Sequence, residues 1–163
     1  MIRYRAHMIR IFFYKLFSVI FLISVLTSCN KIETDRDFEA AIKSEVQRNI
    51  GGTLEFKKIA AFKWTKVLIL APYTNIGRVQ KEMNVNLKPI EHSDIDNRDD
   101  INQLIFFDDD KIIKMIEYPR SDGDFEQELN AGFYSKDNAI FRIMAKSQKW
   151  ANRKPWIVLK QAK

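Results

Sequence analysis

Apolar residues after position 34 first follow the spacing of a helix. The stripe recurs at every fourth position and consists of Phe38, Ile42, Val46 and Ile50. This spacing predicts a helix over residues 35–49 with one face toward a core. Thr34 or Asp35 can cap its first turn. Gly51-Gly52 is expected to end it.

Shorter apolar runs between turn residues predict strands over much of the remaining chain. Residues 66–70 are continuously apolar after Lys66, as in a strand that is buried on both faces. The runs at 104–107 and 112–118 flank an acidic turn at 108–110 and predict a β-hairpin. The other expected strands are residues 53–62, 139–145 and 156–160.

The segments between these strands complete the predicted fold. A second helix of about ten residues is expected after Thr74. Residues 84–100 are polar and predict a long loop, residues 119–124 a turn, and residues 125–130 a single helical turn. Short connections favour antiparallel pairing. The sequence therefore predicts an α+β fold, in which an antiparallel sheet of five to six strands has two helices packed on one face.

The N-terminal residues have the three-part layout of a secretory signal. Residues 1–15 are basic and aromatic, residues 16–27 carry no charge, and small residues precede Cys29. The motif Leu26-Thr27-Ser28-Cys29 resembles the lipobox of bacterial lipoproteins, in which one aliphatic and two small residues precede a cysteine. The resemblance implies cleavage after residues 1–28 and attachment of lipid to the Cys29 thiol.

In this interpretation the chain has three parts. Residues 1–28 are a cleaved lipoprotein signal peptide, residues 29–34 a lipidated tether, and residues 35–163 a single globular α+β domain. Met8 is an alternative start that leads to the same cleavage site. An uncleaved signal anchor is the structural alternative, and both place the domain outside the cytoplasm. Asn30 after the cysteine resembles the sorting signal for the periplasmic side of the outer membrane in Gram-negative bacteria.

Most of the net positive charge of the chain lies in the predicted signal peptide. The formal net charge is +6 at pH 7, and residues 1–28 hold four basic and no acidic residues. Without them, 23 basic and 21 acidic residues remain, a nearly neutral balance. A nucleic-acid-binding face needs a clear basic excess, so no nucleic acid partner is expected. Cys29 is the only cysteine, so a disulfide within the chain is excluded.

Two further stretches resemble small uncharacterised bacterial lipoproteins. The first is Trp64-Thr65-Lys66-Val67-Leu68-Ile69-Leu70-Ala71-Pro72-Tyr73-Thr74. The second comprises Glu117-Tyr118-Pro119-Arg120 and Gly123-Asp124-Phe125. The resemblance supports lipid anchoring and implies no activity, cofactor or site residue.

Catalytic and metal-binding motifs are largely missing from the sequence. His92 is the only histidine after the predicted cleavage site, so neither a Cys–His metal cluster nor a Ser–His–Asp triad with a recognisable motif is expected. A solvated side chain in the polar loop is expected for it. Asp94-x-Asp96 and Asp122-Gly123-Asp124 begin like calcium loops but lack the glutamate at the twelfth position. No catalytic, cofactor-binding or metal-binding residue is therefore assigned, and an irregular calcium site remains an alternative.

The leading functional hypothesis is a non-enzymatic module that is anchored by Cys29 and binds a protein or another component of the cell envelope. One form of it is an immunity or inhibitor protein whose acidic loops 94–100 and 108–110 occupy a basic active site. Aromatic residues that could line a binding surface, with core packing as the alternative, are Trp64, Tyr73, Trp150 and Trp156. Basic residues that could lie near an anionic bilayer, with ordinary solvated charge as the alternative, are Lys146, Lys149, Arg153 and Lys154.

The rival hypothesis is a small carboxylate-dependent hydrolase that acts on cell-envelope material. Paired carboxylates of such enzymes lie roughly 5–10 Å apart. The hypothesis therefore requires two acidic residues to converge in a cleft. The candidates are Asp94, Asp96, Asp122, Asp124 and Glu126.

Overall fold

The computed structural model describes residues 32–126, 132–148 and 154–162. These residues belong to one of two units of the chain, which spans Lys31–Lys163. The lipobox residues Leu26 to Cys29 lie outside the described residues.

The helices are α2 (Arg36–Arg48), α3 (Phe56–Ile59) and α4 (Ile76–Glu82), with 3-10 helices η1 (Lys88–Ile90) and η2 (Ile95–Asn97). The strands are β1 (Thr53–Glu55), β2 (Lys66–Leu70), β3 (Ile101–Asp108), β4 (Lys111–Pro119), β5 (Asp124–Glu126), β6 (Phe133–Ser135), β7 (Ile140–Lys146) and β8 (Trp156–Gln161).

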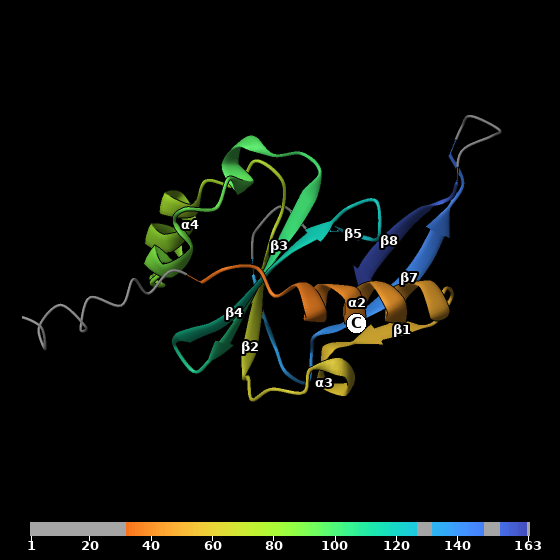
Figure 1. Ribbon diagram of the computed structural model, residues 1–163, viewed down its shortest axis with the longest axis horizontal. Coiled ribbons are helices and arrows are strands. Elements are labelled where there is room, and N and C mark those ends of the chain that lie inside the picture. Colours follow the sequence, from red (N-terminus) through yellow and green to blue (C-terminus); the bar gives the residue numbers. More distant parts are fainter. Residues whose placement is uncertain (1–31, 127–131, 149–153, 163) are drawn as a thin grey trace, which may run out of the picture. The chain divides into compact units, whose positions relative to one another are not determined.

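The strands form two four-stranded sheets instead of the single sheet that the sequence predicted. Sheet A has the order β4-β3-β2-β6, and all of its neighbours are antiparallel. Sheet B has the order β1-β7-β8-β5, in which β5 pairs with β8 in parallel (Figure 1). The α+β class is confirmed, whereas the strand count of five to six in one sheet is wrong.

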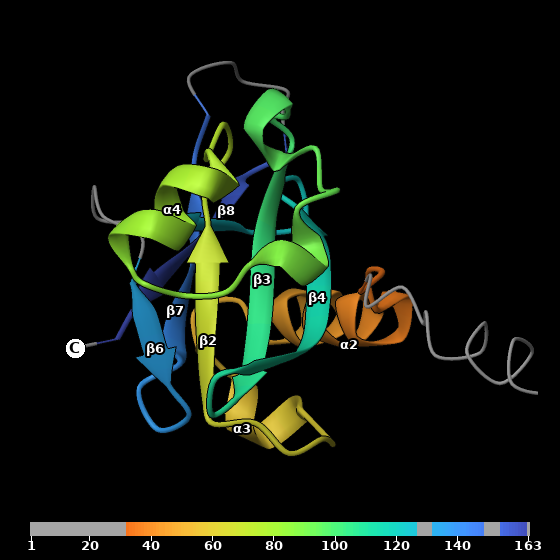
Figure 2. The same cartoon turned by 90° about the vertical axis from the view of Figure 1, so that its left-hand side faces the viewer.

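Sheet A is buried on both faces, as the apolar run of β2 predicted. Val67 and Ile69 point into a first core that is shared with sheet B and α2. Leu68 and Leu70 point into a second core that is closed by α4 and the 3-10 helices. The two longer helices therefore lie over opposite faces of sheet A (Figure 2), and the prediction of two helices on one face is wrong.

The first helix forms where its apolar spacing predicted. Asp35 caps α2 by accepting a hydrogen bond from the backbone N–H of Phe38 at 2.9 Å. The helix ends at Arg48, so Ile50 lies beyond it and is 53% exposed. The last member of the predicted stripe therefore does not reach the core. Gly51 follows with φ 89°, a conformation that glycine adopts without strain.

Other segments differ from the sequence prediction in ways that tertiary packing explains. The β3–β4 hairpin forms around Asp109, but the strand predicted over 53–62 ends at Glu55 and continues as α3. Residues 124–126 form β5 beside β8, where a helical turn had been expected. The predicted loop 84–100 contains both 3-10 helices. It also buries three apolar side chains, those of Leu87, Ile90 and Ile95.

No helix within the described residues is long and apolar enough to cross a membrane.

Candidate functional site around Arg120 and Tyr73

Three chain segments meet at the end of sheet A where β2 and β4 finish. The backbone N–H of Tyr73 donates to the carbonyl oxygens of Ile95, at 2.9 Å, and Arg98, at 3.2 Å. The backbone N–H of Arg120 donates to the carbonyl oxygen of Asp100 at 2.9 Å. The turn after β2, the loop before β3 and the turn after β4 are therefore joined by main-chain hydrogen bonds.

Arg120 is held rigidly at this junction. Its Nε and Nη2 atoms each donate to one carboxylate oxygen of Asp124 at 2.8 Å, and its Nη1 donates to the carbonyl oxygen of Asp99 at 2.7 Å. Asp124 also accepts hydrogen bonds from Asn102 Nδ2 and Trp156 Nε1, each at 3.2 Å. The Arg120 guanidinium lies 5.8 Å from the centre of the Trp156 ring. This network links β3, β5 and β8, and therefore both sheets.

The electrostatics of this network fix both partners in their charged forms. Burial acts to raise the pKa of Asp124, but hydrogen bonds from Arg120, Asn102 and Trp156 outweigh it and hold that pKa below its usual value. The hydrogen bond to Asp124 raises the pKa of Arg120. A carboxylate of this kind accepts hydrogen bonds but does not exchange a proton near neutral pH. Asp124 therefore positions Arg120 and does not act as a general acid.

Tyr73 is the most exposed aromatic residue at this end of the sheet. Its side chain is 63% exposed and its φ is 60°, in the left-handed region. A residue other than glycine pays about 1–2 kcal/mol for that conformation. The ring is mostly exposed, and the hydrogen bonds from the Tyr73 N–H hold this turn against the loop whose Asp99 carbonyl binds Arg120. A left-handed backbone at an exposed aromatic residue motivates the hypothesis of a functional role.

We call this group the Tyr73 surface. It consists of Tyr73, Asp99, Arg120, Asp124 and Trp156.

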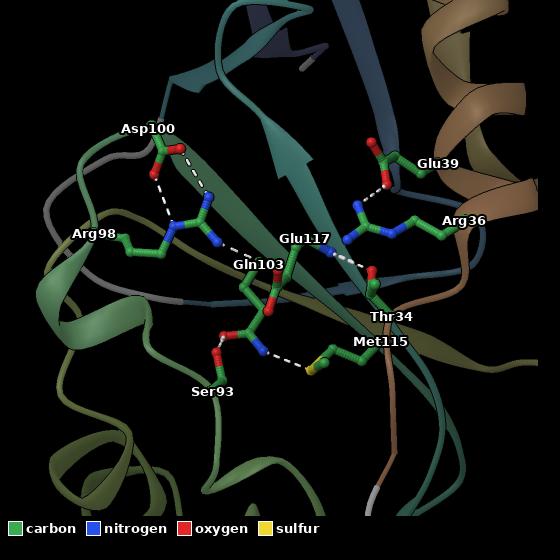
Figure 3. Close-up of polar contacts among 9 residues, drawn as sticks. All are labelled: Thr34, Arg36, Glu39, Ser93, Arg98, Asp100, Gln103, Met115 and Glu117. Atoms are coloured by element: carbon green, nitrogen blue, oxygen red, sulfur yellow. Dashed lines mark hydrogen bonds and ion pairs between the residues drawn. The ribbon is translucent and has the colours of Figure 1, made fainter.

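A second polar cluster connects the loop before β3 with strands β3 and β4 (Figure 3). Arg98 donates to both carboxylate oxygens of Asp100, at 2.8 and 2.7 Å, and to Glu117 at 3.3 Å. Next to it the buried Gln103 accepts from Ser93 Oγ at 2.9 Å and donates to the sulfur of Met115 at 2.7 Å. These contacts fix the loop before β3. The Asp99 carbonyl oxygen of this loop accepts the hydrogen bond from Arg120.

Three carboxylates of the hydrolase hypothesis, those of Asp122, Asp124 and Glu126, have separate basic partners, whereas Asp94 and Asp96 are exposed on their loop. Asp122 forms an ion pair with Lys43 at 3.0 Å. Glu126 forms ion pairs with Lys146, at 3.1 Å, and Lys160, at 3.2 Å. Hydrogen bonds from these two lysines lower the pKa of Glu126, whereas a general acid at neutral pH needs a raised pKa. This arrangement does not favour acid–base catalysis by these residues.

The aromatic candidates differ in where they lie, in the core or at the surface. Trp64 is 2% exposed and packs edge-on against Phe106 in the first core, so it forms no surface. Trp150 lies outside the described residues. The half-buried Trp156 lies against Arg120, and Tyr73 lies in the turn that is hydrogen-bonded to the loop supplying the Asp99 carbonyl to Arg120.

The acidic and basic candidates differ in whether they form ion pairs. In the hairpin loop, Asp108 and Asp110 pair with Lys63 and Lys66, each at 3.0 Å. In the loop 94–100, Asp94, Asp96 and Asp99 are exposed and form no ion pair with the residues that the structure describes. Among the basic candidates, Lys146 pairs with Glu126, Lys154 is exposed, and Lys149 and Arg153 fall in the part of the chain that is not described.

His92 is half-buried, and its Nε2 atom is shielded without a hydrogen-bond partner among the described residues. The solvated side chain expected for it is therefore not observed. Within the same ranges, no group of three potential ligands is arranged to hold a metal ion, and this includes both stretches that begin like calcium loops.

Sequence reasoning missed two residues of the junction, Arg120 as its centre and Asn102 as its buried support. Neither belongs to a catalytic or binding motif. Asn102 lies in β3, where seven successive positions are buried, and its only signal in the sequence is that it is polar in a mostly apolar strand. Comparison of the chain with protein-family models, with curated proteins and with solved structures gave no match.

Proposed function

We propose that the protein is a lipid-anchored extracytoplasmic module that binds another protein of the cell envelope through the Tyr73 surface. Anchoring rests on the lipobox-like motif that ends at Cys29. Binding rests on the side chains gathered around Arg120. Catalysis is not part of the proposal, because the carboxylates at this end are paired with cations or exposed on a loop.

The observation that carries the proposal is an exposed Tyr73, with φ 60°, in a turn joined to the loop that helps to hold a rigid arginine, Arg120. Tyr, Trp and Arg contribute most of the binding energy in protein interfaces, and the Tyr73 surface contains one of each. Arg120 is already immobilised by Asp124 and the Asp99 carbonyl. It therefore loses little side-chain entropy when a partner binds.

A photo-crosslinking experiment tests this proposal. A benzophenone amino acid at position 73 should give discrete crosslinked products in intact cells, and Trp156→Ala should weaken them. The matched control is the same amino acid at position 50, because Ile50 is similarly exposed at 53%. Equal crosslinking from both positions, or crosslinking that Trp156→Ala leaves unchanged, would contradict the proposal that the Tyr73 surface binds a specific partner.

An inhibitor or immunity protein is the form of this function that the charge favours. Asp94, Asp96 and Asp99 carry carboxylates without ion pairs beside Tyr73, and a basic active site would complement them. If a toxin is encoded beside this protein, replacing the three residues by asparagine should abolish protection. The control is Asp109→Asn in the hairpin, which should leave protection intact.

The anchor is tested separately through Cys29. Cys29→Ala should abolish incorporation of labelled palmitate and release the protein from the membrane fraction or leave it unprocessed. A Cys29→Ala variant that still incorporates palmitate and sediments with membranes would refute lipid anchoring.

A further inference from the structure

The residues next to the proposed acylation site are built into the fold. Residues 29–34 were predicted to be a polar tether, but Thr34 forms a parallel β-bridge with Met115 at the edge of β4. The backbone N–H of Asp35 donates to the Met115 carbonyl at 2.8 Å. The N–H of Glu117 donates to the Thr34 hydroxyl at 2.9 Å (Figure 3). The tether therefore ends before Thr34, and the segment behaves as an added edge strand.

Both ends of this segment are held. The backbone N–H of Ile32 donates to the Pro89 carbonyl at 3.0 Å, and its side chain packs against the second core. At the other end, the Asp35 carboxylate caps α2 and forms an ion pair with Lys114 of β4. Hydrogen bonds and burial at both ends leave the described residues before α2 little freedom to swing.

The direction of pairing determines where the chain leaves the domain. Because Thr34 pairs in parallel with β4, the chain traced backward from Thr34 runs toward the start of β4 at Lys111 and away from Arg120. Only Asn30 and Lys31 separate Ile32 from Cys29. Three residue steps span at most about 11 Å. Thr34 pairs with Met115, and the four residue steps from Met115 to Pro119 extend about 13 Å, so the chain at Ile32 leaves the domain on the side away from the Arg120 end.

The charges at the two ends of sheet A point to the same orientation. At the hairpin end, Asp108 and Asp110 are paired with Lys63 and Lys66, which leaves one exposed carboxylate, Asp109, without an ion pair among the described residues. At the opposite end, the carboxylates of loop 94–100 include exposed ones without ion pairs among the described residues. An anionic bilayer repels uncompensated carboxylates within about one Debye length, roughly 8–10 Å. The Arg120 end is therefore the less favourable one to place against lipid headgroups.

We propose that the segment Ile32–Asp35 fixes the orientation of the anchored domain on the bilayer. The β3–β4 hairpin end of sheet A faces the lipid headgroups, and the Tyr73 surface faces away from them, open to a partner. This inference rests on the proposed lipid anchoring at Cys29. It adds a rigid connection in place of a flexible one.

Site-specific quenching tests the orientation. Acylation consumes the only native thiol, so a single introduced cysteine can be labelled with a fluorophore. Lys111→Cys and Ser121→Cys place the label at exposed positions near opposite ends of β4, at its first residue and two residues after its last. The lipidated full-length chain is reconstituted in vesicles of phosphatidylethanolamine and phosphatidylglycerol that contain a headgroup nitroxide lipid. We expect loss of emission from position 111 and unchanged emission from position 121.

A linker variant makes the result specific to the docked segment. Inserting ten Gly and Ser residues between Lys31 and Ile32 should remove the difference between the two label positions, because the domain can then turn freely. Equal quenching at both positions in palmitate-labelled protein overturns the fixed orientation but leaves anchoring intact. A difference that survives the insertion also overturns the role of the segment. Protein without incorporated palmitate would overturn the anchor and the orientation together.

Discussion

Arg120 and Asp124 form a two-pronged ion pair in which both nitrogen–oxygen distances are 2.8 Å. The pair connects the turn after β4 with β5, and thereby one sheet with the other. Asn102 and Trp156 bind the same carboxylate from β3 and β8. A single carboxyl group therefore joins the side chains of Arg120, Asn102 and Trp156.

Removing Arg120 should destabilise the protein. In Arg120→Ala, the half-buried Asp124 keeps its charge but loses its two best hydrogen bonds. We expect the free energy of unfolding to fall by about 2 kcal/mol, which urea denaturation measures. The control is Arg78→Ala, which breaks an exposed 3.9 Å pair with Glu82 and should change stability very little. Equal effects of the two variants would contradict a structural role for Arg120.

The same carboxylate should make stability depend on acid pH. The pKa of Asp124 in the folded protein lies below 3.8, the ordinary value of an aspartate. Its contribution is therefore complete above pH 3.8 and is lost as the pH falls through the lower, folded-state pKa. The difference in unfolding free energy between wild type and Asp124→Asn should shrink as the pH falls below 3.8. A difference that stays constant from neutral pH to pH 3 would disprove the coupling.

Tyr73 should matter more for binding than for stability. The ring is mostly exposed, so Tyr73→Gly removes little buried area and relieves the backbone strain at φ 60°. The greater freedom of glycine in the unfolded chain offsets part of that relief. We expect the free energy of unfolding to change by less than about 1 kcal/mol, while partner binding, measured with the identified crosslinked partner, is lost. Retained binding in a stable Tyr73→Gly protein would remove Tyr73 from the interface.

Asp35 combines a helix cap and an ion pair, and two variants separate them. Asp35→Ala loses the hydrogen bond from the Phe38 N–H and the contact with Lys114. It should cost about 1–2 kcal/mol in thermal or urea unfolding. Asp35→Asn keeps a capping oxygen and loses only the charge, so a smaller cost is expected. If the two variants lose the same stability, the cap contributes nothing and the Lys114 contact accounts for the whole effect.

Phe106 should be a critical residue of the first core. Its ring makes edge contacts with four aromatic rings, those of Phe38, Phe56, Phe62 and Trp64. Phe106→Ala should reduce the free energy of unfolding by about 3–5 kcal/mol, because a cavity replaces these contacts. Ile50→Ala serves as the exposed control and should be close to neutral. A small loss in Phe106→Ala, measured by denaturation, would show that the core closes around the cavity.

Local elements of this fold were predictable where the signal lies within a few neighbouring residues. The Asp35 cap, the apolar spacing of α2 and the turn between β3 and β4 depend on contacts close in sequence. They appear in the structure where they were expected. The run at β2 also indicated burial on both faces, and the two cores confirm it. Strand-like residues 56–59 form α3 instead, because Phe56 packs into a core that distant segments supply.

The candidate site was far less predictable. Tyr73 and Trp156 were singled out as aromatic residues, but nothing near them in the sequence indicated that Trp156 lies against Arg120 or that the Tyr73 turn is joined to the loop that binds Arg120. Arg120 obtains its role from Asp124, from the Asp99 carbonyl and from the ring of Trp156. The Trp156 contact depends on the parallel pairing of β5 with β8, two segments more than thirty residues apart.

The sequence by itself determined the α+β class, the helix at α2, the hairpin, and the expectation of a lipid anchor at Cys29. Those features depend on periodicity and on short motifs, which a linear chain displays directly. Only the tertiary structure decided that the strands divide into two sheets, that the helices cover opposite faces, and that Thr34 docks on β4. Side-chain spacing defines which face of a strand is apolar but not which distant surface covers it, and long-range packing makes that choice.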